Sequence, residues 1–247
     1  MPAPELQHGA AVLVSDRAPI RISAQAIGQF LPHERGVPAG RRLARIEHRR
    51  TRSPHHRGRD RSGLVSFHGP MVATALRLGE SGYNRTLLLD VLSGKLVRFP
   101  LEGTRTLQKG TGEGRLIGGC LSLVVATLGT KYEIDTTDSI LVIEDQDTKP
   151  YQVDRMLIQL KHAGKLDNVR GIVIGEMLNC IQNSNQGYAL EDVMLDILSD
   201  VGCPILFGFP TGHVSGAHAI VPFGVRARLH LGSEGAFELL EPAVAVQ

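Results

Sequence analysis

Residues 139–174 read SILVIEDQDTKPYQVDRMLIQLKHAGKLDNVRGIVI, and the fold class can be predicted from this segment. SILVIE at 139–144 is a continuous apolar run of strand length, which is typical of a buried strand. A helical pattern follows from Pro150 to Gly164, with four apolar residues on one face: Val153, Met156, Leu157 and Leu160. GIVI at 171–174 is a second buried strand. The pattern therefore predicts a strand–helix–strand unit of an α/β fold.

The sequence on both sides of this unit continues the alternation of strands and helices. On the C-terminal side it predicts a helix and then three strands, over residues 189–198, 204–208, 219–224 and 225–231. On the N-terminal side, GLVSFHGP at 63–70 predicts a strand that ends at a Gly-Pro turn. The sequence then predicts helical structure over 71–94, strands over 95–108, and a helix over 117–128 that begins at two glycines.

The composition is that of a globular protein. The chain has 247 residues, of which 42% are hydrophobic and 21% charged, enough for one large domain or two small ones. No apolar run approaches the ~20 residues that a membrane span requires, and the first residues do not read as a secretory signal. Three cysteines, Cys120, Cys180 and Cys203, lack disulfide or metal spacing, so we expect reduced thiols in a cytoplasmic protein.

Charge divides the chain into two unequal parts. Residues 1–62 contain twelve arginines, no lysine and five acidic residues, a net charge of +7, whereas residues 63–247 carry −5. AAVLVS at 10–15 predicts one short strand, but 33–62 follow no structural period. Three interpretations stay open: a basic arm for nucleic acid or anionic lipid, a solvated non-folding stretch, or the product of a GC-rich gene read out of frame.

From Gly63 onward the chain resembles the LD-carboxypeptidases, the serine peptidases of the S66 type. The resemblance rests on motifs in a fixed order: GLVSFHGP, IGGCLSL, LVIED, PYQVDRML, QLKHAGKL, GFPTGH and VPFGVRARL. It implies a two-domain α/β protein with a Rossmann-like N-terminal part. We accordingly expect a divergent, disordered or incomplete region over 1–62, the remainder of the N-terminal peptidase domain over 63–95, and the C-terminal LD-carboxypeptidase domain over 96–247.

Glu144 is the first candidate for catalysis, because it ends a buried strand, where α/β folds place functional groups. By its residue type it could orient a histidine, bind a hard cation together with Asp145 and Asp147, or cap the helix near Pro150. The resemblance aligns Glu144 with the glutamate of the family's Ser-His-Glu triad. Asp145 and Asp147 are better interpreted as capping or surface acids, and no metal or cofactor is expected.

His213 is the second candidate. It lies in FPTGHVSG, a glycine-rich loop between two predicted strands, and histidine can act as a general base near neutral pH. An isolated Gly-His pair is more often an exposed loop histidine. The resemblance to the family pattern, with its GH pair before the VPFG strand, assigns His213 as the triad histidine. We interpret His68, in FHGP, as structural, and His218 matches no family position.

The nucleophile is not identified. The resemblance places it in a glycine-rich turn upstream of residue 63, which would expose its hydroxyl and donate backbone N–H groups to the oxyanion. The serines available there are not flanked by glycines: Ser15, Ser23, Ser53 and Ser62. Ser15, after the run at 10–15, is the least unsuitable of them. Cys120, after two glycines, is a second alternative, but a buried core thiol is the better interpretation.

The function implied by the resemblance is hydrolysis of the amide bond to a terminal D-amino acid in cytoplasmic muropeptides during cell-wall recycling. A sister branch, the microcin C immunity proteins, cleaves a peptidyl-nucleotide amide. The alternative from another class is a catalytically inactive chain that only binds ligand or self-associates. We expect a peptide substrate and no nucleic-acid or membrane partner, with a homodimer left open.

Overall fold

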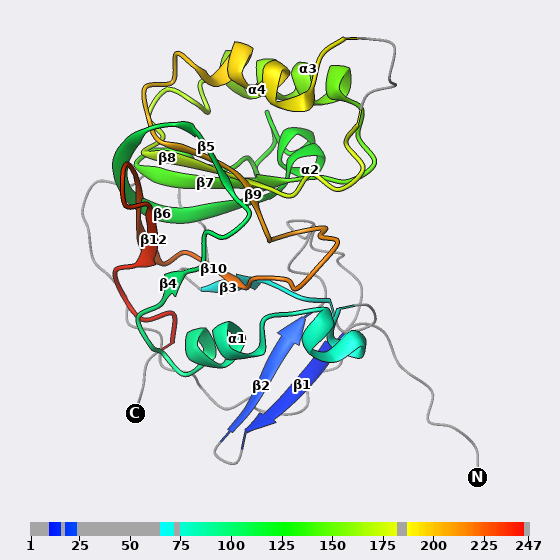
Figure 1. The fold of residues 1–247 in the computed structure, drawn as a ribbon, viewed down its shortest axis with the longest axis vertical. Helices are drawn as coiled ribbons and strands as arrows, with labels where there is room; N and C mark the ends of the chain where they lie inside the picture. Colours follow the sequence, from blue (N-terminus) through cyan, green and yellow to red (C-terminus); the bar gives the residue numbers. More distant parts are fainter. Residues whose placement is uncertain (1–9, 16–17, 24–64, 72–74, 182–186, 245–247) are drawn as a thin grey trace.

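The computed structural model describes residues 10–15, 18–23, 65–71, 75–181 and 187–244 (Figure 1). Most of the region 1–62, predicted to be divergent and Arg-rich, lies outside the described residues. Within it, β1 (Ala10–Ser15) confirms the strand predicted there and pairs antiparallel with β2 (Ala18–Ser23). The domain boundaries after 62 and 95 stay predictions.

A mixed eight-stranded sheet forms the centre of the described fold, which confirms the α/β class. Its strand order is β4-β12-β11-β6-β7-β8-β9-β5. The four strands from β6 to β9 run parallel, and the outer strands join them antiparallel. The bounds in chain order are β4 Arg98–Phe99, β5 Arg105–Gln108, β6 Gly110–Cys120, β7 Ser139–Glu144, β8 Gly171–Gly175, β9 Ile205–Phe209, β11 Arg226–Leu231 and β12 Ala236–Leu239.

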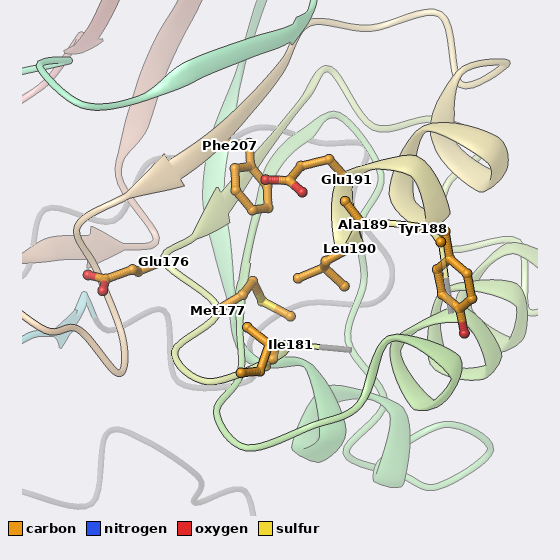
Figure 2. A pocket seen from close by; sticks show the side chains of 10 residues that line it. Glu176, Met177, Ile181, Tyr188, Ala189, Leu190, Glu191 and Phe207 are labelled. Atoms are coloured by element: carbon orange, nitrogen blue, oxygen red, sulfur yellow. The ribbon is translucent and has the colours of Figure 1, made fainter. Parts of the chain in front are cut away.

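Three helices cover one face of this sheet (Figure 1): α2 (Leu121–Ala126), α3 (Pro150–His162) and α4 (Leu190–Leu198). Leu141 and Ile143 of β7 face these helices and are fully buried among their apolar side chains. Leu190 and Phe207, from the same core, also line a hollow beside α4 (Figure 2). This face buries the apolar stripe that the sequence predicts for α3.

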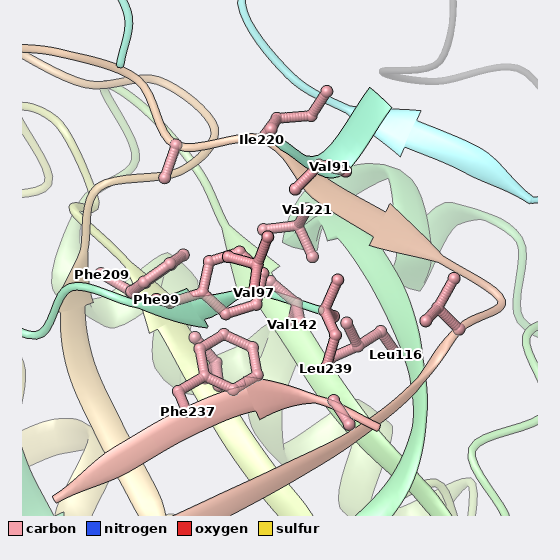
Figure 3. Packing of buried hydrophobic residues seen from close by; sticks show 14 of the residues in the cluster. Val91, Val97, Phe99, Leu116, Val142, Phe209, Ile220, Val221, Phe237 and Leu239 are labelled. Atoms are coloured by element: carbon pink, nitrogen blue, oxygen red, sulfur yellow. The ribbon is translucent and has the colours of Figure 1, made fainter. Parts of the chain in front are cut away.

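The other face of the sheet is covered by α1 (Arg85–Leu92) and by a small antiparallel ladder of β3 (Ser66–His68) and β10 (Val221–Phe223). Ile140 and Val142 of β7 alternate with Leu141 and Ile143 and contribute to this second core. Figure 3 shows its aromatic centre, where the rings of three phenylalanines pack with centroids 4.5–5.7 Å apart: Phe99, Phe209 and Phe237.

One predicted helix is wrong at its beginning. The sequence suggests a helix over 117–128, but β6 continues to Cys120 and α2 begins only at Leu121. Gly118 has φ +140, and a Cβ there would lie 1.7 Å from the carbonyl oxygen of Val142 on β7. The glycine therefore allows two strands to approach closely, and does not open a helix.

The segment 95–108 forms two short strands, β4 and β5, at opposite edges of the sheet. The helical text over 71–94 forms η2 (Leu76–Ser81) and α1, which Asn84 caps by accepting a hydrogen bond from the backbone N–H of Leu87 at 2.9 Å. The structure adds β2, β6 and β12, which are not predicted, and confirms the other predicted elements within a few residues. None of the helices in the described residues has the length and apolar character needed to cross a membrane.

Candidate active site

Glu144 is the last residue of β7, and its side chain is fully buried. Because side chains alternate along a strand, it faces the same side of the sheet as Ile140 and Val142, toward α1 and the β3–β10 ladder. Gly175, at the end of the neighbouring β8, leaves room for it, since a Cβ there would lie 2.6 Å from the Cβ of Glu144. The fold thus places a carboxylate at the C-terminal edge of the parallel strands.

His213 lies in the loop after β9 and meets this carboxylate. Oε2 of Glu144 accepts two hydrogen bonds from it, from ring Nδ1 at 2.8 Å and from the backbone N–H at 3.0 Å. With Nδ1 donating to Glu144, the other ring nitrogen, Nε2, is the one that can exchange a proton with another molecule. The imidazole is 22% exposed, so it can be reached from solvent. The structure therefore brings together the two candidate residues, which are far apart in the sequence.

The pKa shifts of Glu144 and His213 are those expected when a carboxylate stabilises a protonated imidazole. Burial raises the pKa of Glu144, but the hydrogen bonds from His213 and the proximity of His68 outweigh it and hold the pKa below its ordinary value. The hydrogen bond to Glu144 raises the pKa of His213, and burial opposes this only in part. Glu144 is thus ionised at neutral pH and favours the protonated form of His213.

The second carboxylate oxygen of Glu144 faces His68. Nε2 of His68 lies 3.8 Å from Oε1, too far for a hydrogen bond, and both side chains are completely buried. Among the described residues, neither ring nitrogen of His68 nor Oε1 of Glu144 has a hydrogen-bond partner. Burial lowers the pKa of His68 to about 4, so its ring is neutral at pH 7. The residue interpreted as structural from the sequence therefore lies beside the candidate site, stacked on Phe223 at a centroid distance of 5.3 Å.

His218 is also buried and braces the loop that carries His213. Its Nδ1 donates to the carbonyl of Ala219 at 2.8 Å, and its Nε2 accepts from the backbone N–H of Gly212 at 3.2 Å. Burial lowers its pKa, so it acts as a neutral acceptor. Sequence reasoning gave His218 no role, and its only signal was its place in the same glycine-rich loop.

The two neighbouring acids do not contact His213 by hydrogen bonds. Asp145 accepts from the backbone N–H of Ser122 at 2.9 Å, so it caps α2 and not the helix near Pro150. Asp147 is exposed and accepts from the side-chain amide of Asn179 at 3.0 Å. In the part of the chain that the structure describes, no group of three or more His, Cys, Asp or Glu side chains is arranged to hold a metal ion.

The structure does not identify a nucleophile. Cys120 is half-buried, its Sγ lies 3.1 Å from the hydroxyl of Ser122, and burial raises the pKa of the thiol, which disfavours the reactive thiolate. Ser15 lies in β1 and Ser23 in β2. Ser53 and Ser62 fall outside the described residues. Among the described residues, the ring of His213 bonds to Glu144 and to no hydroxyl group.

Residues 113–229 match the family model of the LD-carboxypeptidase C-terminal domain. A probable murein peptide carboxypeptidase of Bacillus subtilis is 40% identical over 184 residues, which are 71% of this chain and 56% of that protein. A putative carboxypeptidase of Synechocystis is 36% identical over 181 residues, 73% of this chain and 58% of that protein. The chain thus spans little more than half the length of these curated relatives.

Solved structures agree on the fold. The muramoyltetrapeptide carboxypeptidase from Oxalobacter formigenes superposes with a TM-score of 0.61 at 27% identity, covering 72% of this chain and 61% of that one. The microcin C7 self immunity protein MccF superposes with a TM-score of 0.63 at 20% identity, covering 74% and 63%. At that identity the second likeness concerns the fold alone.

Proposed function

Because this chain belongs to the LD-carboxypeptidase family through residues 113–229, we propose that the protein is a serine-type carboxypeptidase. Its substrate would be a cytoplasmic muropeptide or similar peptide, and the bond broken would be the amide to a terminal D-amino acid. The observation that carries the proposal is the buried Glu144, whose Oε2 accepts from both the ring and the backbone of His213.

In this mechanism His213 is the general base. Its Nε2 removes the proton from a nucleophilic hydroxyl as the oxygen attacks the substrate carbonyl, and Glu144 stabilises the imidazolium that forms. The tetrahedral intermediate collapses when His213 passes the proton to the leaving amine, which frees the D-amino acid. Water, activated by the same histidine, then hydrolyses the acyl-enzyme. Charge is conserved, since one proton moves from hydroxyl to amine and a second from water back to the hydroxyl.

A second candidate is a catalytically inactive protein that binds a peptide without cleaving it. One observation favours it: within the described residues no serine hydroxyl contacts His213. In that case the Glu144–His213 pair would persist as a binding feature. The two candidates differ in one property, the presence of a reactive hydroxyl within reach of Nε2.

Labelling with a fluorophosphonate probe, which reacts with activated serines, tests the proposal, with mass spectrometry to map the adduct. We expect one labelled serine in the wild type and no adduct in His213→Ala or Glu144→Ala. In parallel, the wild type should release D-alanine from a muropeptide, and His213→Ala should lose this activity by a factor on the order of 10⁶, as other triads do. A folded wild-type protein with neither adduct nor D-alanine release would overturn the proposal and support the inactive candidate.

A further inference from the structure

Glu176 is not a member of the Glu144–His213 pair, but its carboxylate binds the loop that carries His213. It directly follows β8, the strand beside β7 in the sheet. Both of its carboxylate oxygens lie 3.1 Å from the backbone nitrogen of Ser215, which donates to them. Ser215 is two residues after His213, so this contact fixes the chain on the C-terminal side of the catalytic candidate.

Three backbone N–H groups of this loop donate to side chains, one within the loop itself and two from the ends of neighbouring strands. Gly212 donates to His218, His213 to Glu144, and Ser215 to Glu176. The first two contacts hold the loop up to His213. Glu176 supplies the contact that follows, so without it the backbone after His213 would lose its side-chain acceptor.

The segment that presents Glu176 is itself held in an uncommon conformation. Met177 and Asn179 have φ values of +54 and +57, a region that residues other than glycine seldom adopt. Met177 is buried in the core beneath α4, and Figure 2 shows the side chain of Glu176 pointing away from those of Met177 and Leu190. Such strain is retained where the surrounding structure fixes it, often at functional sites.

This segment is also tied to the loop after β7. The backbone N–H of Asp147 donates to the carbonyl of Leu178 at 2.9 Å, and the side-chain amide of Asn179 donates to Asp147 at 3.0 Å. The loops that follow Glu144 and Glu176 are therefore braced against each other. These contacts oppose a movement of the backbone that carries Glu176 relative to the loop that follows Glu144.

We infer that Glu176 is a positioning residue, which clamps the backbone at Ser215 so that the ring of His213 stays within hydrogen-bond distance of Glu144. Its effect is mechanical, because the carboxylates whose charges raise the pKa of His213 are Glu144, Asp145 and Asp147. The consequence for catalysis rests on the proposed function, but the consequence for the geometry of His213 does not.

The test measures the titration of the His213 ring by NMR in the labelled full chain, with the signal assigned by comparison with His213→Gln. In Glu176→Ala the ring should lose part of its bond to Glu144, and its pKa should fall toward the ordinary histidine value. Glu176→Gln keeps an acceptor at the same place without the charge, so the pKa should stay at the wild-type value. Ser215→Ala keeps the backbone N–H and should also leave the pKa of His213 unchanged. Ser215→Pro removes the donor and should lower this pKa as Glu176→Ala does.

Thermal unfolding of each variant separates positioning from general stability. If Glu176→Ala lowers Tm but leaves the titration of His213 unchanged, Glu176 is only structural and the inference is wrong. An equal shift in Glu176→Ala and Glu176→Gln would show a charge effect and also overturn it. Should Ser215→Pro fail to fold, the two Glu176 variants still decide. If the variants show the expected titrations of His213 but the wild type releases no D-alanine, the inference is supported and the proposed function is rejected.

Discussion

Gly212 lies directly against the carboxylate of Glu144. A Cβ at Gly212 would be 2.1 Å from Cγ and 2.4 Å from Oε2 of Glu144, and the residue has φ +85. No other amino acid fits between the loop and the buried acid without moving one of them. The glycine before His213 is therefore a steric requirement of the pair.

Gly212→Ala should displace the loop and separate His213 from Glu144. Because the substitution combines a clash with an unfavourable φ, we expect a loss of at least about 2 kcal/mol in the free energy of unfolding. Urea denaturation measures it. The matched control is Gly216→Ala in the same loop, where a Cβ would meet nothing within 4 Å and where φ is not in the positive region. Equal losses in both variants would contradict the steric account.

The raised pKa of His213 sets the direction of a pH effect. Its hydrogen bond to Glu144 stabilises the charged ring, so this contribution to stability is complete below pH 6.5 and is lost as pH rises through the higher folded pKa. Glu144→Gln removes the charge and should lower the pKa of His213 as followed by NMR. Since a general base must be neutral, the acid limb of kcat/KM should move to lower pH in this variant, if activity is measurable. An unchanged titration would show that Glu144 does not control the ring.

His68 should make the protein less stable in mild acid. Burial lowers its pKa to about 4, while the unfolded chain takes up the proton near pH 6.5, so stability falls as pH decreases between these values. Between pH 7 and pH 5 the loss attributable to His68 should be on the order of 2 kcal/mol. His68→Gln should show a correspondingly smaller difference between urea midpoints at the two pH values. His162→Gln, at an exposed histidine, should retain the wild-type difference.

Phe209 connects the second core to the candidate site. It is fully buried against Phe99 and Phe237 and ends β9, four residues before His213. Phe209→Ala should cost about 3–5 kcal/mol of unfolding free energy, because the cavity cannot collapse around two remaining rings. Leu96→Ala, at a side chain that is 63% exposed, should change stability by less than about 0.5 kcal/mol. Chemical denaturation of both variants checks the contrast.

The strands and the helix within residues 139–174 could be predicted because the spacing of their apolar residues indicates both the type of each element and its buried face. β6 could not, although its side chains alternate, because two of its buried positions are Gly112 and Gly114. A Cβ at Gly112 would lie 1.6 Å from the carbonyl oxygen of Arg170, so close approach of a neighbouring backbone requires the glycine. A hydropathy pattern cannot detect a buried face made of glycine.

The candidate site was predictable only in part. Glu144 and His213 were selected by family resemblance, since an acid after a strand and a histidine in a loop are common. Neither His68 nor Glu176 was recognised, because each reaches the site through pairings between distant parts of the chain. His68 pairs with Val221 across the β3–β10 ladder, and Glu176 meets Ser215 from a separate strand. Such contacts leave no periodic trace in the sequence.

The strand order has a consequence for synthesis on the ribosome. β6 lies inside the finished sheet, yet its antiparallel neighbour β11 is made much later, with Arg115 paired to Arg226. Until that segment emerges, one side of β6 has unpaired backbone groups that can capture a strand of another nascent chain. β11 and β12 follow the other strands of this sheet in the chain, so a ribosome stalled before residue 226 would leave that edge of β6 open.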